Sequence, residues 1–435
     1  MLSLDNWYAE PMRYWNVEEP AKLSGLPTNT TDILRRIREG LEESVKLTLR
    51  SDVPVGVALS GGIDSGAIAA LAQKNSSEPV HAFSVGYPGR PSYDERDQAQ
   101  ALAKQLGMIF HEVELPVGSF VDFFPQLVRV MDEPIADSAA FGHYAVPKVA
   151  ADLGIKVLLN GLGGDELFWG YPGVTQTVAT NQILATSPLL NAILPLTASP
   201  GIQRFLSKVT RHPRVPSVCQ RWASLLYGVR TLAKPVQHLH FPEAWPHFKE
   251  TFAIKHMVYG PAMCAISEQN PFKPTDIGPR TVEQLPAAVI RLLFDTWLVS
   301  NCLSLGDRVS MSVGVETRLP FLDVRLIELV MALRRQQPDH MLGQKAWLRA
   351  ALKDLLPEEV LARRKAGFQP PVWKWLSGVV ARYGYDLHES SLTTVGILDP
   401  NRIDHVLKMS CHGLSSLYFA YKLVLLEEWH KGVVG

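Results

Sequence analysis

The chain has 435 residues, of which 46% are hydrophobic and 20% charged, as in an ordinary globular enzyme. Lys plus Arg and Asp plus Glu both number 43, so no net charge recruits nucleic acid or an anionic membrane. The four cysteines form no Cys-x-x-Cys pair, which disfavours zinc and iron–sulfur sites and predicts buried thiols at Cys219, Cys264, Cys302 and Cys411.

Residues 1–30 are predicted to form an extended arm that aromatic side chains hold on the body of the protein. These aromatic residues are Trp7, Tyr8, Tyr14 and Trp15. The first residues show no basic-then-apolar export signal, which favours a cytoplasmic protein. A helix is expected next, because apolar residues recur at three- and four-residue steps from Ile33 to Leu49, with Asp32 or Thr31 as its cap.

Strand-like and helix-like segments then alternate, which predicts an α/β fold with a parallel, doubly wound sheet and ligands at the carboxyl ends of its strands. The predicted strands are Val55–Leu59, Val80–Val85, Phe110–Leu115 and Lys156–Asn160, and the predicted helices are Ala67–Gln73, Tyr93–Leu106, Phe120–Met131 and Gly142–Leu153. After Tyr171 the pattern is mainly helical. We therefore expect an α/β lobe at residues 31–175 and a helical lobe at residues 176–435, with a cleft between them.

The segment from Leu167 to Gln203 contains no charged residue. Prolines interrupt it too often for a membrane span. They stand at positions 172, 188, 195 and 200. The segment is predicted either to form buried helices near the mouth of the active site or to present a docking surface for a partner or lipid, and the chain is expected to have no transmembrane segment.

A glycine-rich loop, Ser60-Gly-Gly-Ile-Asp-Ser65, follows the first predicted strand and leads into a helix. Glycines let the backbone close on an anion, and the N–H groups of a helix N-terminus attract negative charge. The serine hydroxyls add donors, and Asp64 can hold Mg²⁺. The chain has no Gly-x-x-x-x-Gly-Lys-[Ser/Thr] loop. A glycine-rich turn without a ligand is the alternative.

A second loop of the same design follows the strand that ends near Asn160. It reads Gly161-Leu-Gly-Gly-Asp165-Glu166 and again places a carboxylate in the first turn of a helix. Two such loops on one sheet can bring Asp64 and Asp165 to opposite sides of one magnesium pyrophosphate. Compensation of the helix dipole by Asp165 and Glu166 is the simpler alternative.

The first loop resembles the PP-loop of ATP pyrophosphatases, which cut ATP between its α- and β-phosphates. Together with Gly161–Tyr171, it resembles the synthetase domain of the asparagine synthetase family over roughly residues 30–430. The further matching blocks are Phe83–Gly86, Tyr93–Glu95, Asp132–Asp137, Gly306–Met311, Val315–Asp323, Lys345–Arg349 and Arg363–Phe368.

The resemblance implies a five-stranded ATP-pyrophosphatase sheet and assigns the site residues. The adenosine and the α-phosphate would contact Leu59, Val85, Asn160 and Gly161. The pyrophosphate would lie on Ser60, Gly61, Gly62, Asp64 and Ser65, with Mg²⁺ on Asp64 and Asp165. Gly164 is a further expected residue of the nucleotide site. Lys345 and Lys365 would neutralise charge on the leaving pyrophosphate, so the expected catalytic residues are Lys345, Asp165 and Lys365.

Outside the resemblance, other assignments of these residues stay open. Lys345 would be an ordinary solvated cation. Arg308 and Arg318 fit structural ion pairs as well as substrate contacts. The run Asp132-Glu-Pro134 either shapes a pocket for the acid substrate or ends a helix.

The family reaction is adenylation of a carboxylate, aspartate by default, followed by amide formation with ammonia and release of AMP and pyrophosphate. Two departures bear on this expectation. The chain starts Met1-Leu2, without the N-terminal cysteine of a glutaminase domain. Ammonia is therefore expected from solution or from a separate glutaminase subunit, unless another amine is the nucleophile; a truncated gene is a further alternative. Leu162 stands where authentic asparagine synthetases usually have glutamate. The alternatives are an amide synthetase of a specialised-metabolite or exopolysaccharide pathway and a non-catalytic subunit that partners a glutaminase.

Overall fold

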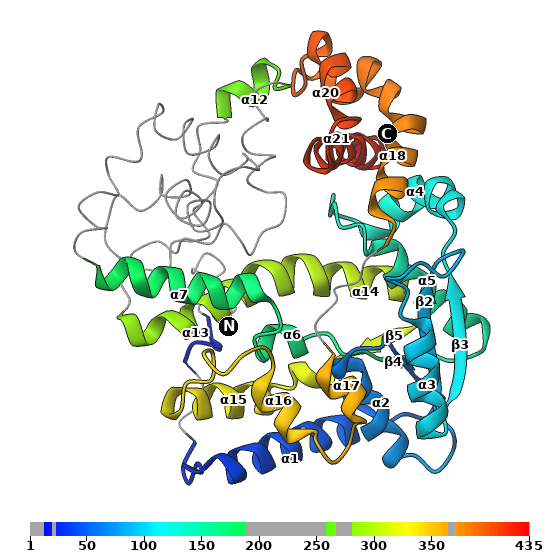
Figure 1. The fold of residues 1–435 in the computed structure, drawn as a ribbon. Coiled ribbons are helices and arrows are strands. Elements are labelled where there is room, and N and C mark those ends of the chain that lie inside the picture. The colour runs from blue at the N-terminus through cyan, green and yellow to red at the C-terminus, as the bar shows by residue number, and fades with distance from the viewer. Residues whose placement is uncertain (1–12, 20–22, 188–257, 267–280, 364–369, 435) are drawn as a thin grey trace, which may run out of the picture.

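The computed structural model describes residues 13–19, 23–187, 258–266, 281–363 and 370–434. It contains a parallel sheet of five strands in the order β3-β2-β1-β4-β5 (Figure 1). The strands are β1 (Val55–Ala58), β2 (His81–Gly86), β3 (Ile109–Glu114), β4 (Val157–Leu159) and β5 (Glu316–Arg318). The predicted parallel α/β fold is confirmed, and four of the strands lie within one residue or two of their predicted ends.

The fifth strand was not predicted from the sequence as a separate segment. Strand β5 has three residues, Glu-Thr-Arg, none of them apolar, and joins the sheet by pairing in parallel with β4 from Val157 to Leu159. Its backbone groups rather than its side chains make it a strand. It lies more than 150 residues after β4 in the chain, within the segment that we expected to be mainly helical.

Neighbouring residues of a strand point to opposite faces of the sheet, and helices cover both faces. Ala82 and Leu159 lie in one core cluster, under α2 (Ile63–Lys74) and α3 (Arg96–Leu106). Phe83 and Leu158 lie in a second cluster. The helices over that second face are α4 (Val117–Met131), α5 (Ala140–Asp152) and α14 (Ser304–Met311).

The strand order creates one point where the chain changes direction. Strands β1, β2 and β3 add in one direction, and β4 then returns to the other side of β1. In open parallel sheets, a crevice for ligands forms outside the carboxyl ends of the two strands at this point. The two glycine-rich loops follow β1 and β4, so they lie side by side at this crevice.

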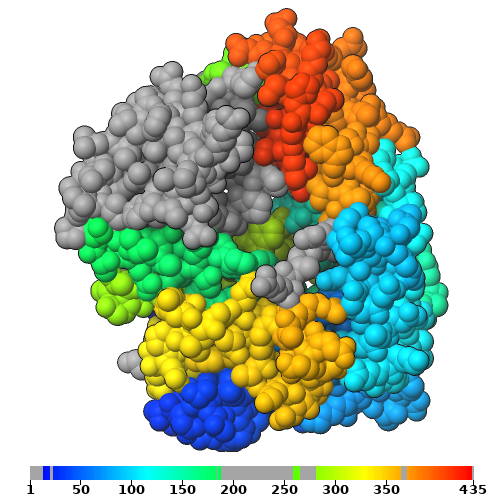
Figure 2. Space-filling view, viewed as in Figure 1, coloured from blue at the N-terminus to red at the C-terminus, as the bar shows by residue number. Residues whose placement is uncertain are grey.

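The remaining described helices come from parts of the chain that lie before and after the first four strands. Helix α1 (Thr30–Thr48) packs against α15 (Val324–Gln336) and α16 (Ala346–Ala351) as one layer (Figure 1, Figure 2). The other longer elements are α7 (Pro172–Thr186), α13 (Leu285–Leu293), π-helix η5 (Phe294–Leu303), α18 (Val372–Tyr383), α20 (Ile403–Ser410) and α21 (Leu414–Val434). The shorter ones are α6 (Gly164–Leu167), α12 (Pro261–Ile266), α17 (Glu358–Ala362), α19 (Ser391–Thr394), η4 (Val282–Gln284), η6 (Pro320–Leu322), η7 (Gly384–Glu389) and η8 (Pro400–Arg402).

The N-terminal arm and the start of α1 agree only in part with the expectations. Helix α1 is capped by Asn29, whose side chain accepts the Asp32 N–H at 2.9 Å, and not by Asp32 or Thr31. In the arm, Trp15 donates to Glu328 at 3.2 Å, whereas Tyr14 is 97% exposed. Trp7 and Tyr8 lie outside the described residues.

The charge-free segment is described only as far as residue 187. There it forms α6 and α7, with Val174 and Val178 buried, and the rest lies outside the described residues. Of the cysteines, Cys302 is buried as expected, Cys264 and Cys411 are exposed, against expectation, and Cys219 lies outside the described residues.

One helical run in the described part of the chain, Val282–Met311, is long and apolar enough to cross a membrane. Half of its most apolar window is buried inside the structure, as in a core helix. The run therefore gives only weak support for a membrane span.

Candidate functional site

The first loop is held in shape by its own serines. The buried Ser65 hydroxyl donates to the Ser60 carbonyl at 3.0 Å and accepts the Ser60 N–H at 3.0 Å. The Ser60 hydroxyl accepts the Gly62 N–H at 3.3 Å. Helix α2 begins immediately after Gly62, which places Asp64 in the first turn. The serines therefore shape the loop, in addition to the donor role that the sequence predicted for them.

The second loop packs directly on the first. A side chain at Gly161 would place its Cβ 2.7 Å from the Ser65 backbone nitrogen, and one at Gly164 would place it 2.6 Å from the Asp64 carboxyl carbon. Both contacts are closer than real Cβ atoms approach, so these two positions require glycine. Because Asp165 directly follows Gly164, this close packing places Asp165 near Asp64.

Lys345 connects the two carboxylates. Its ammonium group contacts Asp64 Oδ2 and lies 2.6 Å from Asp165 Oδ1. All three side chains are at most 12% exposed, so water screens their charges weakly. The structure thus confirms the prediction that the two loops bring Asp64 and Asp165 close together. The lysine that the bare sequence would leave in solvent is 3% exposed and lies between them.

The other predicted site residues lie around the same crevice. Leu59 follows β1, Val85 is near the end of β2, and Asn160 follows β4 and accepts the Leu162 N–H at 3.0 Å. Their contacts with a nucleotide stay predictions. Lys365 lies outside the described residues, so nothing places it.

Glu166 has a larger structural role than dipole compensation. Its buried carboxylate accepts the Gly163 N–H at 3.0 Å and the Tyr171 hydroxyl at 2.7 Å. Gly163 has φ +96°, a left-handed conformation that favours glycine, so Glu166 fixes the turn that leads to Asp165. Burial, followed by the charge of Asp165, raises the pKa of Glu166. The spacing of Gly163 and Glu166, like that of a capping box, could have indicated this role.

The two arginines with open assignments form structural ion pairs. Arg318 pairs with Glu316 at 2.8 Å and donates to the Thr48 and Arg50 carbonyls at the end of α1. Arg308 pairs with Glu133 at 3.0 Å and donates to a carbonyl at the end of α4. Both therefore join secondary-structure elements.

Two further arginines near the crevice were not singled out from the sequence. Arg363 donates to the Gly61 carbonyl in the first loop. Arg349 donates to three backbone carbonyls between the start of α16 and Arg363. Their partners are backbone atoms, so no pattern of side chains could have indicated these contacts.

Two carboxylates on separate loops fit a magnesium ion that shares oxygens with a nucleotide. Mg²⁺ commonly takes one or two carboxylates and completes its shell with phosphate oxygens and water. Within the described residues, no group of three or more His, Cys, Asp or Glu side chains could hold a metal ion. The donor set therefore suits an ion that arrives with the nucleotide's phosphates.

Comparison with known proteins identifies a family over most of the chain. The model of the family described as asparagine synthase matches residues 36–431. Asparagine synthetase [glutamine-hydrolyzing] 1 of Bacillus subtilis is 28% identical over 381 residues, which cover 86% of this chain and 55% of that protein. A putative asparagine synthetase [glutamine-hydrolyzing] of Mycobacterium tuberculosis is 29% identical and covers 82% of this chain and 52% of that protein.

Another curated relative carries a different name. Amidase chyE of Penicillium rubens is 26% identical over 430 residues, covering 92% of this chain and 62% of that protein. The chain thus spans about half the length of the first two relatives. Among solved structures, the NH3-dependent NAD synthetase of Campylobacter jejuni covers 47% of this chain and 95% of its own, with 15% identity and a TM-score of 0.23.

Proposed function

Because this chain belongs to the asparagine synthase family, we propose that it is an ATP-dependent ligase that activates a carboxylate as an acyl-adenylate and joins it to an amine. Aspartate and ammonia are the default pair, and AMP and pyrophosphate are the other products. The observation that carries the proposal is the ammonium of Lys345 between Asp64 and Asp165, on two loops that meet at the switch point of the sheet.

The first step of the proposed reaction forms the adenylate. A carboxylate oxygen attacks the α-phosphorus of ATP, and the bond from that phosphorus to the pyrophosphate oxygen breaks. The first loop and the N-terminus of α2 would bind the pyrophosphate through backbone N–H groups. Asp64 and Asp165 would hold Mg²⁺, which when bound neutralises phosphate charge. Lys345 would stabilise the charge that builds on the departing pyrophosphate.

In the second step the amine nitrogen attacks the acyl carbon, the bond to AMP breaks, and the nitrogen loses a proton. Leu162 cannot accept that proton, so the proton acceptor differs from the glutamate usual at this position. The protein's main contribution is to hold the acid and the nucleotide in line. A cytoplasmic location, where ATP is available, and ammonia from solution or from a separate glutaminase complete the proposal.

A different substrate pair is the second candidate. It is favoured by Leu162 and by a relative named an amidase rather than an asparagine synthetase. A non-catalytic role is disfavoured, because it gives no reason for a lysine and two carboxylates to share a buried site, where unused charges are costly.

The test is ATP–pyrophosphate exchange with a panel of carboxylic acids. Exchange that depends on aspartate supports the default pair, and exchange that depends only on another acid supports the second candidate. If no acid stimulates exchange while the protein binds MgATP, the ligase proposal is wrong. Amide formation should then be measured with ammonium and with other amines.

A further inference from the structure

Lys345, the residue just before α16, has an unusual backbone conformation. Its φ is +53° and its ψ +29°, in the left-handed region that residues other than glycine rarely adopt. Such a strained residue persists only when its surroundings hold it. The direction of the Lys345 side chain, and so its reach to both carboxylates, depends on this turn.

Two contacts from the second loop hold one side of the turn. The Lys345 N–H donates to the Phe168 carbonyl at 3.0 Å. The side-chain amide of Gln344 donates to the Gly170 carbonyl at 2.9 Å. Both acceptors lie just after α6, the helix that carries Asp165. The turn is thus tied to the loop with which Lys345 pairs.

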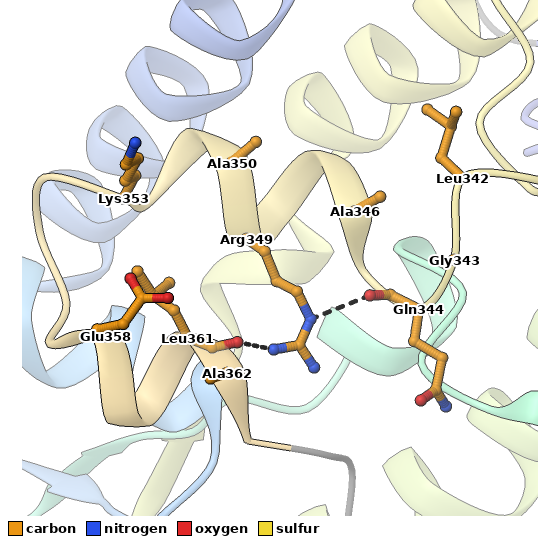
Figure 3. A pocket seen from close by; sticks show the side chains of 10 residues that line it. All are labelled: Leu342, Gly343, Gln344, Ala346, Arg349, Ala350, Lys353, Glu358, Leu361 and Ala362. Atoms are coloured by element: carbon orange, nitrogen blue, oxygen red, sulfur yellow. Dashed lines mark hydrogen bonds between the residues drawn. The ribbon is translucent and has the colours of Figure 1, made fainter.

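Arg349, one helical turn further on, holds the other side. Its Nε donates to the Gln344 carbonyl at 3.1 Å. One terminal nitrogen donates to the Leu361 carbonyl, and the other donates to the Arg363 carbonyl at 2.8 Å. Figure 3 shows the guanidinium group between Gln344 and the end of α17. The planar fork of an arginine can serve three acceptors in this way, and an ammonium cannot match its geometry.

The third of these acceptors leads back to the first loop. Arg363, whose carbonyl Arg349 binds, directs its own guanidinium to the Gly61 carbonyl. Arg349 therefore links the turn at Gln344 to Arg363, and the guanidinium group of Arg363 contacts the first glycine-rich loop. Loss of Arg349 would free both ends of this connection at once.

We propose that Arg349 is a positioning residue for the pyrophosphate site, acting through Lys345 and Arg363. It does not touch the ligand itself. The identity of that ligand, the pyrophosphate part of MgATP, rests on the proposed function.

The surroundings of Arg349 make the proposal testable by chemical rescue. A pocket of about 450 Å³ lies beside its guanidinium group, lined by residues of α16, α17 and the turn before α16. In Figure 3, Lys353 stands on the far side of this pocket and points away from the guanidinium group. A small cation can therefore reach the position that the Arg349 side chain would vacate.

The experiment measures MgATP affinity, and the Michaelis constants for MgATP and for the acid in the exchange assay, for three variants. Arg349→Ala is expected to weaken MgATP binding about tenfold or more, because three backbone contacts are lost. The Michaelis constant for the acid should change little. Arg349→Lys keeps the charge but not the fork and should resemble Arg349→Ala. Lys353→Ala, on the rim of the same pocket, is the control and should bind as the wild type does.

Millimolar guanidinium should restore MgATP affinity to Arg349→Ala and leave the wild type and Lys353→Ala unchanged. Wild-type affinity in both Arg349 variants would overturn the inference, as would guanidinium that raises thermal stability without restoring affinity. If Arg349→Ala does not fold, Arg349→Lys decides by the same measurements. A wild-type protein that fails to bind MgATP overturns the proposed function instead, and the inference with it.

Discussion

At the scale of single residues, the site is a small set of charges that water screens weakly. The ammonium group of Lys345 contacts two carboxylates, and none of the three side chains is more than 12% exposed. Attraction between such charges is much stronger than at a protein surface. The three groups are held together by the loops that carry them and by this attraction. A substitution of any one of them tests its part in the site.

Replacing Asp165 with asparagine should abolish the reaction without unfolding the protein. The change keeps size and shape, and Lys345 keeps Asp64 as its partner. The proposed metal ion loses one of its two carboxylates, so we expect acid-dependent ATP–pyrophosphate exchange to fall by about 10²-fold or more. The control is Asp152→Asn, because Asp152 lies on the surface and pairs only with Lys148 in the described structure. Undiminished exchange in Asp165→Asn would exclude the metal role.

Glu166 predicts how stability depends on pH. Burial and the charge of Asp165 raise its pKa in the folded protein above the ordinary value of 4.5. Between 4.5 and that raised pKa, the folded protein binds more protons at Glu166 than the unfolded chain does. Stability contributed by this group therefore falls as the pH rises through this window, and it levels off above the raised pKa.

In Glu166→Gln the side chain at position 166 cannot titrate. The free energy of unfolding of this variant should therefore fall less than that of the wild type over the same pH window. Urea unfolding at a series of pH values measures the difference between the two proteins. Glu43→Gln, at an exposed position on α1, should retain the wild-type slope. Equal slopes for Glu166→Gln and the wild type would show that Glu166 ionises normally in the folded protein.

At the scale of elements, the sequence carried information where side-chain type determines structure. Gly61, Gly161 and the acids that follow them marked the two loops, and apolar runs marked β1, β2, β3 and β4. Strand β5 was missed because backbone pairing alone defines it. The contacts of Arg349 and Arg363 were missed because their partners are backbone carbonyl groups, which every residue carries. Lys365 lies outside the described residues, so its predicted role stays a prediction.

The contact between the two loops makes a specific prediction for Gly161. In Gly161→Ala the new Cβ would lie 2.7 Å from the Ser65 nitrogen, which belongs to the backbone and cannot turn aside. The loops must separate, so we expect a loss of about 1–3 kcal/mol in stability and a marked loss of MgATP affinity.

Gly118→Ala is the matched control for that variant. Gly118 lies in the first turn of α4, and a Cβ there would meet nothing within 4 Å. Alanine favours helix more than glycine does, so this variant should be neutral or up to about 1 kcal/mol more stable. Calorimetry and MgATP titration on both proteins give the comparison. If Gly161→Ala binds MgATP as Gly118→Ala does, the close packing of the loops is not needed for the site.

At the scale of the whole molecule, neither hydrophobic core belongs to one half of the chain. The first contains Ile33 and Leu71 together with Val330 and Leu348. The second brings Phe120 together with residues of α18, α20 and α21. Each core thus draws on residues before and after position 175, and chain segments from both sides of that position must fold together to bury either one.

Trp375 of α18 tests this dependence most directly. It is fully buried and stacks on Phe120 of α4, with 4.6 Å between the ring centres, and it packs edge-to-face with Phe141 of α5, with 5.7 Å between the ring centres. Trp375→Ala should therefore cost about 3–5 kcal/mol. The lost contacts join α18 to α4 and α5, which pack on the sheet. The midpoint of urea unfolding should therefore fall both for a signal that reports on the sheet and for a signal that reports on the C-terminal helices.

Trp373→Ala supplies the control, because Trp373 lies two residues away on the same helix and is 45% exposed. Its removal should change the midpoint little. If Trp375→Ala lowered the midpoint for the C-terminal helices alone and left the sheet at its wild-type value, those helices would be an independent unit. A common shift of both signals would instead mean that the sheet carrying Asp64 and Asp165 is stabilised by residues more than 200 positions further along the chain.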